Sequence, residues 1–273
     1  MKPTQTDKRT AFRALHARGI FLLPNPWDIG SARMLQHLGF QALASTSSGF
    51  AWSVGRADYA SSRQAVIEHL AALSQAVDLP LNADLEGGFA AEPEAVAETV
   101  RLAIGAGVAG LSIEDTRIDS SGLYELALSV ERIAAARSAI DRSGADVLLV
   151  ARTELLLHDP AALTPAIDKL VAFAAAGADC LYAPGVREPK DIATLVRAVA
   201  PRPVNVLMHR PGLSVAELAD LGVRRVSVGG ALARVAWGAL LAAAEQLRAG
   251  SFEGLSKAAS GADLNRIFAT FES

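Results

Sequence analysis

The segment LNADLEGGF, residues 81–89, combines an apolar strand pattern with two acidic residues and a turn. Side chains of a β-strand alternate between its two faces, so Asn82, Asp84 and Glu86 are expected on one face and the aliphatic residues between them on the other. The paired glycines that follow end the strand. The segment therefore predicts a strand that carries two carboxylates at its carboxyl end.

A second strand pattern, GLSIED at residues 110–115, places Ser112 and Glu114 on one face. If the two strands are neighbours, Glu114 lies beside Asp84 and Glu86. Two unit charges roughly 5 Å apart repel by about 3 kcal/mol at an effective dielectric constant of about 20, so such a cluster requires protonation, a basic side chain or a bound cation. Oxygen ligands of this kind suit Mg²⁺ or Mn²⁺ better than zinc. A strand end that is neutralised by an arginine alone is the alternative.

One unit recurs along the chain: an Ala-rich helical stretch, a turn of small residues and a short strand rich in aliphatic side chains. Glycine after a helix releases the chain into the next strand. The expected strands are residues 20–23, 41–45, 80–84, 110–114, 146–150, 179–182, 203–208 and 224–228. Eight strands that alternate with helices predict a (β/α)₈ TIM-type barrel of the α/β class. A doubly wound open sheet is the alternative.

Two Ala-rich segments, 232–248 and 261–271, follow the eighth strand and predict extra C-terminal helices. We therefore expect residues 1–273 to form a single α/β barrel domain. The barrel is expected over about residues 20–240 and the helical tail over about residues 241–273.

Composition and charge favour a globular chain with a small-molecule partner. The formal net charge of -3 gives no electrostatic footprint for nucleic acid or for an anionic membrane. No segment is long and apolar enough to span a bilayer, and the polar N-terminus does not match a signal peptide. The single cysteine, Cys180, excludes an internal disulfide framework and is typical of a cytoplasmic protein.

Chemistry in α/β barrels occurs at the carboxyl ends of the strands, where several polar residues of this chain are expected. Arg152 follows the fifth strand, and an unpaired guanidinium would be costly to bury there. Glu114, Glu154 or a substrate carboxylate is expected to neutralise it. The segment 46–49 either offers backbone N–H groups to a carboxylate or forms only a tight turn. His209 is either a proton donor or a bystander, and Trp27 either closes the barrel mouth or packs beneath it.

Several spaced motifs resemble those of the isocitrate lyase/phosphoenolpyruvate mutase superfamily. They occur in one order from about residue 20 to about residue 235: PNPWDIGSA at 24–32, the Asp84/Glu86 pair, IED at 113–115, ARTE at 151–154, PVNVL at 203–207 and GVRRVSVG at 222–229. The resemblance implies an α/β barrel that holds Mg²⁺ beneath a 2-oxo acid or its enolate. It also implies a homo-dimer or homo-tetramer whose subunits exchange a terminal helix.

The resemblance assigns the metal to Asp84, Glu86 and Glu114, although Glu86 is one methylene longer than the aspartate of the family pattern. It assigns the carboxylate and oxo oxygens of the substrate to Arg152. Asp58 matches an aspartate on the loop after the second strand.

Backbone amides near Ser47 and Ser48, and the side-chain amide of Asn205, match groups that contact the substrate in that family. Combined with the strand-end residues above, the predicted catalytic residues are Arg152, Asp58 and His209. The predicted substrate-binding residues are Trp27, Ser47, Ser48, Asp84, Arg152 and Asn205.

The loop after the fourth strand departs from the family pattern. Residues 116–124 read TRIDSSGLY, without the cysteine that serves as the acid in isocitrate and methylisocitrate lyases and without the lysine of the phosphonate enzymes. We expect a Mg²⁺-dependent (or Mn²⁺-dependent) lyase that breaks a C–C bond in a small 2-oxo acid of the pyruvate, oxaloacetate or 2-oxoglutarate type, or in a compound that yields one, through an enolate. The alternatives are a C–P bond hydrolase or mutase acting on phosphonopyruvate-like substrates and a non-catalytic binder of 2-oxo acids.

Overall fold

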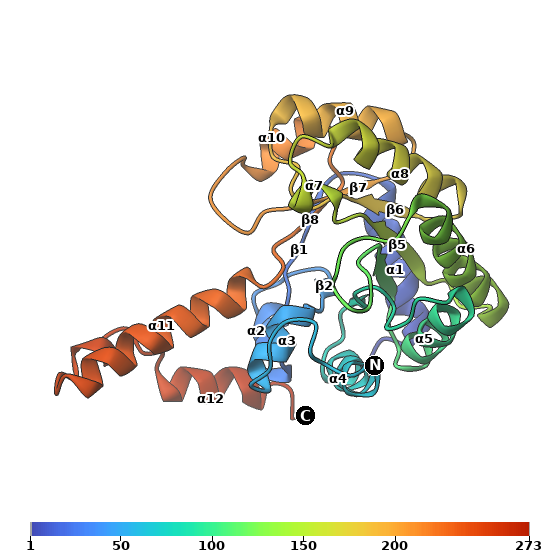
Figure 1. Ribbon diagram of the computed structural model, residues 1–273. Coiled ribbons are helices and arrows are strands. Elements are labelled where there is room, and N and C mark those ends of the chain that lie inside the picture. Colours follow the sequence, from blue (N-terminus) through green and yellow to red (C-terminus); the bar gives the residue numbers. More distant parts are fainter. Residues whose placement is uncertain (1, 273) are drawn as a thin grey trace.

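The computed structural model describes residues 2–272 and contains a sheet of eight parallel strands surrounded by helices (Figure 1). The strands are β1 (Phe21–Leu23), β2 (Leu43–Ala44), β3 (Leu81–Asp84), β4 (Gly110–Glu114), β5 (Leu148–Arg152), β6 (Cys180–Tyr182), β7 (Val204–Leu207) and β8 (Arg225–Ser227). Each lies within two residues of its predicted position, and β5 begins two residues later than expected because Asp146 and Val147 belong to the preceding turn.

The strand order is β1-β8-β7-β6-β5-β4-β3-β2, so the first strand pairs with the last. At the remaining gap, the backbone N–H of Ala44 in β2 donates to the carbonyl of Pro24, just after β1, at 3.1 Å. The sheet is thus a nearly closed barrel. This order confirms the predicted (β/α)₈ architecture and excludes the doubly wound open sheet.

Helices cover the outside of the barrel and extend beyond it at the C-terminal end of the chain. Within residues 2–272, no helix is long and apolar enough to cross a bilayer. The α-helices are α1 (Gln5–Ala17), α2 (Ile29–His37), α3 (Ser47–Ser53), α4 (Arg63–Ala76), α5 (Pro93–Gly105), α6 (Leu126–Ser143), α7 (Leu155–His158), α8 (Leu163–Ala175), α9 (Pro189–Val199), α10 (Val215–Asp220), α11 (Ala231–Arg248) and α12 (Gly261–Ala269). A short 3₁₀ helix, η1 (Glu253–Leu255), separates α11 from α12.

Strand alternation divides the side chains of β3 and β4 as the sequence predicts. Leu81, Ala83 and Leu85 are no more than 1% exposed and pack in the main hydrophobic core. The polar residues of the same strands therefore face the barrel interior. The register places Asp84 opposite Ser112, and Glu114 of β4 opposite Arg152 of β5, so the sheet itself gathers the predicted site residues.

Helix α1 closes the amino-terminal end of the barrel. Its first turn is fixed by a capping box between Thr4 and Asp7, and its Phe12 side chain is fully buried in a small cluster with the lower strands. Gly110 is required there, because a Cβ atom at this position would lie 2.6 Å from the Phe12 ring. The barrel is thus packed with apolar side chains at one end, and the polar strand ends lie at the other.

Candidate active site

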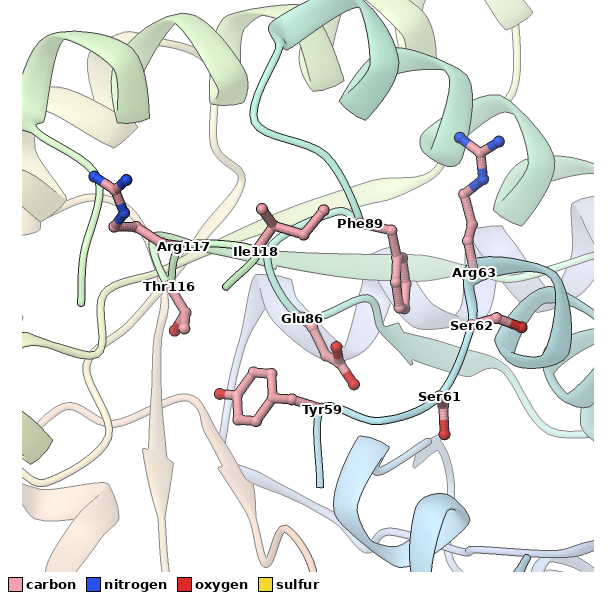
Figure 2. Close-up of a pocket in the computed structure, with 10 residues that line it drawn as sticks. Tyr59, Ser61, Ser62, Arg63, Glu86, Phe89, Thr116, Arg117 and Ile118 are labelled. Atoms are coloured by element: carbon pink, nitrogen blue, oxygen red, sulfur yellow. The ribbon is translucent and has the colours of Figure 1, made fainter. Parts of the chain in front are cut away.

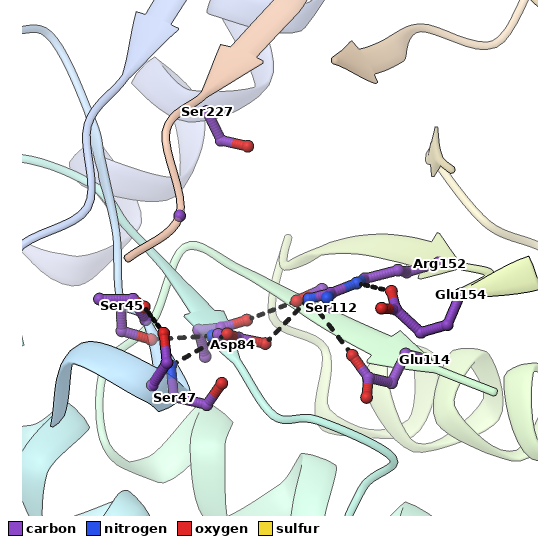
Figure 3. Close-up of polar contacts among 12 residues, drawn as sticks. Ser45, Ser47, Asp84, Ser112, Glu114, Arg152, Glu154 and Ser227 are labelled. Carbon is purple, nitrogen blue, oxygen red and sulfur yellow. Dashed lines mark hydrogen bonds and ion pairs between the residues drawn. The ribbon is translucent and has the colours of Figure 1, made fainter. Parts of the chain in front are cut away.

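Arg152 is the centre of an ion-pair cluster at the carboxyl ends of β3, β4 and β5 (Figure 3). Its Nη1 lies 3.2 Å from Glu114 Oε2 and 3.7 Å from Asp84 Oδ1, and its Nε pairs with Glu154. Burial tends to lower the pKa of Arg152, but Glu114 and Glu154 outweigh it and hold the pKa well above its usual value. Both sequence-predicted carboxylate partners therefore contact the guanidinium.

The Asp84 carboxylate is held in place by the segment that follows β2. Its Oδ2 accepts the backbone N–H of Ser47 at 3.0 Å, and its own N–H donates to Ser45 Oγ at 2.8 Å. Its Oδ1 is buried, and no donor among the described residues forms a hydrogen bond with it. The Ser47 amide, predicted as a substrate donor, thus contacts Asp84, and the Ser48 hydroxyl lies 3.1 Å from Thr46 Oγ1.

Glu86 lies just beyond β3 in a left-handed conformation, with φ of 51°. It is only 7% exposed, and the structure gives its carboxyl group no hydrogen bond or ion pair among residues 2–272. Burial, followed by the neighbouring charges of Asp84 and Glu114, raises the pKa of Glu86 to about 8. This carboxyl group is therefore largely protonated at neutral pH unless a cation lies beside it.

Glu86 faces a pocket of about 260 Å³ between the segment after α3 and the loop after β4 (Figure 2). Tyr59, with φ of 62°, and Phe89, with φ of 58°, line the same pocket. Left-handed conformations cost non-glycine residues roughly 1–2 kcal/mol each, and strained residues of this kind cluster at functional sites. Three of them around one pocket mark it as part of the site.

Tyr59 belongs to this cluster, although the sequence did not indicate it. Its hydroxyl donates to Glu114 Oε1 at 2.8 Å. The preceding Asp58, a predicted catalytic residue, is solvent-exposed, and partial burial together with the charge of Asp84 raises its pKa. Because residues 54–62 carry no periodic pattern, only the proximity of Tyr59 to Asp58 in the sequence could have pointed to it.

Other predicted residues lie outside this cluster. His209, in the loop after β7, lines a separate pocket of about 80 Å³, and its buried Nδ1 has no hydrogen-bond partner in the described part of the chain. The backbone N–H of Trp27 donates to Ser31 Oγ at the start of α2. Asn205 is 0% exposed, and both ends of its amide already form hydrogen bonds inside the barrel.

Asp115, next to Glu114, has a structural role. Its carboxylate accepts hydrogen bonds from the Thr153 hydroxyl at 2.7 Å and the Glu154 backbone N–H at 2.9 Å, and it pairs with Lys169 at 2.7 Å. Asp115 therefore fixes the segment that carries Arg152 and Glu154, and it has no carboxylate oxygen free to face a ligand.

Among residues 2–272, no three Asp, Glu, His or Cys side chains are already drawn together as a metal centre. The donor chemistry nevertheless fits a hard divalent cation. No donor within residues 2–272 forms a hydrogen bond with the buried Asp84 Oδ1, and the buried carboxyl group of Glu86 has a raised pKa. These oxygen donors, together with Glu114, are the ligands that Mg²⁺ or Mn²⁺ prefers.

Comparison with known proteins places the chain in an established family. The phosphoenolpyruvate phosphomutase family model matches residues 12–248. A solved structure from Burkholderia cenocepacia J2315, described as a candidate lyase/mutase, is 51% identical with a TM-score of 0.92 and is aligned over 97% of this chain and 96% of its own. A second structure from the same organism, described as a candidate phosphonomutase, is 38% identical with a TM-score of 0.83, over 89% of this chain and 99% of its own.

A curated relative is named as an enzyme of 2-oxo acid chemistry. The oxaloacetate decarboxylase of Chromohalobacter salexigens is 31% identical over 240 residues, which are 83% of this chain and 80% of the relative. Relatives are thus named as lyases, decarboxylases and mutases. The chain is accordingly an enzyme of the isocitrate lyase/phosphoenolpyruvate mutase superfamily, and it belongs to the phosphoenolpyruvate phosphomutase family within it.

Proposed function

We propose that the protein is a divalent-cation-dependent lyase that breaks a C–C bond in a small 2-oxo acid, or in a compound that yields one. The observation that carries this proposal is the position of Arg152, whose guanidinium lies between Asp84 and Glu114 at the barrel mouth. The two carboxylates can bind a divalent metal ion, and the planar guanidinium can donate hydrogen bonds. Together they complement a ligand that coordinates the metal ion with one edge and accepts hydrogen bonds with another.

Asp84, Glu86 and Glu114 are the residues that would hold the cation. A Mg²⁺ or Mn²⁺ ion bound there supplies Lewis-acid polarisation of the oxo group. Arg152 donates hydrogen bonds to the carboxylate and oxo oxygens of the substrate. As the C–C bond breaks, negative charge moves to the oxo oxygen, and the fixed guanidinium of Arg152 stabilises this charge in a buried environment.

The test is turnover with a defined 2-oxo acid. Oxaloacetate is incubated with the protein, and pyruvate and CO₂ are measured with Mg²⁺, with EDTA and after Mg²⁺ is restored. EDTA is expected to abolish turnover, and Mg²⁺ to restore it. Asp84→Ala is expected to lose more activity than Glu86→Ala, because the shorter, backbone-anchored Asp84 is better fixed as a direct ligand. Undiminished activity of Asp84→Ala in EDTA would refute the proposal.

A second candidate function is cleavage or migration of a C–P bond, which the likeness to the phosphonomutase structure favours. Phosphorus NMR with phosphonopyruvate separates this function from C–C bond cleavage, because cleavage or migration of the C–P bond yields inorganic phosphate or phosphoenolpyruvate instead of CO₂.

We also propose that the subunits form a homo-dimer or homo-tetramer through the C-terminal arm, α11 to α12. This arm projects from the barrel (Figure 1), and it exposes Val235 by 70%, Leu241 by 62% and Phe252 by 76%. Exposed apolar side chains in this number are typical of a surface covered by another chain.

We also propose a cytoplasmic location, which is expected from the single cysteine.

A further inference from the structure

Arg132 of α6 is a buried cation that is held by backbone oxygens and an aromatic ring. Its side chain is 1% exposed. Its Nη1 donates to the Glu114 carbonyl at 3.1 Å, and its Nη2 donates to the carbonyls of Gly87 and, at 3.1 Å, Ala90. The guanidinium also lies over the Tyr124 ring, 4.2 Å from its centroid. All hydrogen bonds of this guanidinium in the described part of the chain therefore end on backbone carbonyls.

The three carbonyls belong to two segments that carry candidate cation ligands. Glu114 ends β4, whereas Gly87 and Ala90 belong to the turn after β3, which begins at Glu86. A direct bond joins the same two segments, since the Glu114 N–H donates to the Glu86 carbonyl at 3.0 Å. The backbones of Glu86 and Glu114 are therefore connected twice, once directly and once through Arg132.

Two features favour an outward shift of the turn after β3. Glu86 and Phe89 have φ of 51° and 58°, and left-handed conformations are unfavourable for residues other than glycine. The carboxyl groups of Glu86 and Glu114 also repel each other when both are ionised. An outward shift would relieve the strain and the repulsion, and the hydrogen bonds from Arg132 to the turn oppose that shift.

We propose that Arg132 is a positioning residue for the divalent cation, because it fixes the separation of the Glu86 and Glu114 carboxyl groups. A planar guanidinium with donors on separate nitrogens can bridge carbonyls of two segments at once. This bridge holds both carboxyl groups near their binding positions before the cation arrives, so the cation does not have to order them. The inference rests on the proposed function, because that function assigns the cation to these carboxyl groups.

The first test is Arg132→Lys, which keeps the positive charge but places all donors on one nitrogen. A single ammonium group cannot occupy the positions of both Nη1 and Nη2, so the bridge between the segments is lost. Electron paramagnetic resonance measures Mn²⁺ binding without substrate, as loss of the signal of free Mn²⁺. The affinity is expected to be at least about tenfold weaker than in the wild-type protein, the scale for removing a group that orients a metal ligand. Circular dichroism and the melting temperature check that the variant folds.

Arg137→Lys is the matched control on the same helix. Arg137 pairs with Asp141 at 2.8 Å and with Asp179 at 3.0 Å, and neither residue belongs to β4 or to the turn after β3. Any loss of melting temperature in Arg137→Lys is expected to leave Mn²⁺ affinity unchanged. A purely structural role would give Arg132→Lys the same behaviour, with a lower melting temperature and an unchanged affinity of the folded protein.

Gly87→Ala tests the position of the turn while Arg132 stays intact. A Cβ atom at Gly87 would lie 2.6 Å from the Thr116 carbonyl oxygen, so the turn must move relative to the loop after β4 (Figure 2). Gly87 is not in the left-handed region, so its backbone conformation permits alanine. Mn²⁺ affinity is expected to fall by about tenfold in Gly87→Ala. It is expected to stay unchanged in the control Gly105→Ala, at the end of α5, where a Cβ atom meets nothing within 4 Å.

Each variant is compared with its own control. An Mn²⁺ affinity of Arg132→Lys equal to that of Arg137→Lys, or of Gly87→Ala equal to that of Gly105→Ala, would overturn the positioning role while the proposed function stands. Gly87→Ala decides the question by itself if Arg132→Lys does not fold. Absence of Mn²⁺ binding in the wild-type protein would overturn both the positioning role and the proposed function.

Discussion

At the scale of single residues, Arg152 has more acidic neighbours than one cation can neutralise. Asp84, Glu114 and Glu154 all lie within ion-pairing distance of it. The nearby Glu86 carboxyl group has no hydrogen bond or ion pair among residues 2–272. Burial raises the pKa of Glu86 and Glu114, and repulsion among these carboxyl groups raises it further. A bound cation that removes this repulsion is therefore expected to stabilise the folded protein as well as the complex with the ligand.

Glu86→Gln tests this repulsion through the pH dependence of stability. The folded pKa of Glu86, about 8, lies above its ordinary value of 4.5. Between these values the folded chain binds more protons than the unfolded chain, so this group makes stability fall as pH rises from about 5 to 8. In EDTA, Glu86→Gln is expected to melt at least about 2 °C higher than the wild-type protein at pH 8, and to melt at nearly the same temperature at pH 5.

Thermal unfolding followed by circular dichroism measures this difference, and Glu92→Gln, a change at a residue in the exposed turn before α5, is the control. A melting temperature of Glu86→Gln that falls below the wild-type value at pH 8 would show that the carboxylate is already compensated in the metal-free protein.

Strand alternation and the order of strands were sufficient to predict that Asp84, Glu114 and Arg152 meet. Each is the last residue of its strand, and neighbouring parallel strands end at the same edge. Sequence could not predict that Tyr59 reaches Glu114, because an irregular segment delivers it. It also could not predict that the side-chain oxygen of Asn205 accepts a hydrogen bond from Arg225, because Arg225 lies on another strand.

At the scale of elements, the loop after β4 is an ordered turn instead of a catalytic arm. Thr116 forms a bridge with Leu123, the Arg117 N–H donates to Gly122, and the Tyr124 N–H donates to Asp115. Arg117 is too basic to act as an acid, and the exposed Asp119 carboxylate accepts hydrogen bonds from Ser121. No side chain of this loop therefore replaces the missing cysteine.

We therefore expect that isocitrate and 2-methylisocitrate are not cleaved at useful rates. The measurement is a coupled assay for glyoxylate or pyruvate release, with oxaloacetate as the reference substrate at the same protein concentration. Robust glyoxylate release from isocitrate would contradict this expectation, and the acid would then have to be sought at Asp58, His158 or His209.

The strand positions followed from the recurring unit of helix, turn and strand, but the start of β5 did not. The aliphatic run that includes Val147 reads as strand from its first residue, whereas the structure uses Asp146 to pair with Arg13 of α1. A tertiary contact of this kind has no local signal in the sequence. The displacement matters, because it makes Arg152 the last strand residue instead of a loop residue.

At the scale of the whole molecule, the C-terminal arm is the least covered part of the chain. The sequence predicted its two helices, and the structure gives α11 over residues 231–248 and α12 over residues 261–269. Their direction could not be predicted, since α12 returns to contact α2, and Phe271, just after α12, lies against the Arg33 guanidinium of α2. Helix α11 leaves a groove of about 520 Å³ beside α3, lined by Trp52 and Trp237.

Leu241→Glu is expected to dissociate the proposed oligomer, because it places a charge in the exposed apolar face of α11. Light scattering coupled to size exclusion measures the mass, and Gln246→Glu adds the same charge at a polar position of the same helix. The wild-type protein and Gln246→Glu are expected at a multiple of 28.5 kDa. A monomeric wild-type protein would refute the arm as a subunit contact.

The central claim is that Arg152 and a divalent cation together bind a 2-oxo acid, and oxalate binding tests it most directly. Oxalate resembles the enolate of such a substrate and can bind a cation and the guanidinium fork at once. Calorimetry is expected to show binding in Mg²⁺, none in EDTA, and an affinity at least about tenfold weaker in Arg152→Lys, because an ammonium group cannot form two parallel hydrogen bonds. Binding that is indifferent to Mg²⁺, or unchanged in Arg152→Lys, would contradict the account.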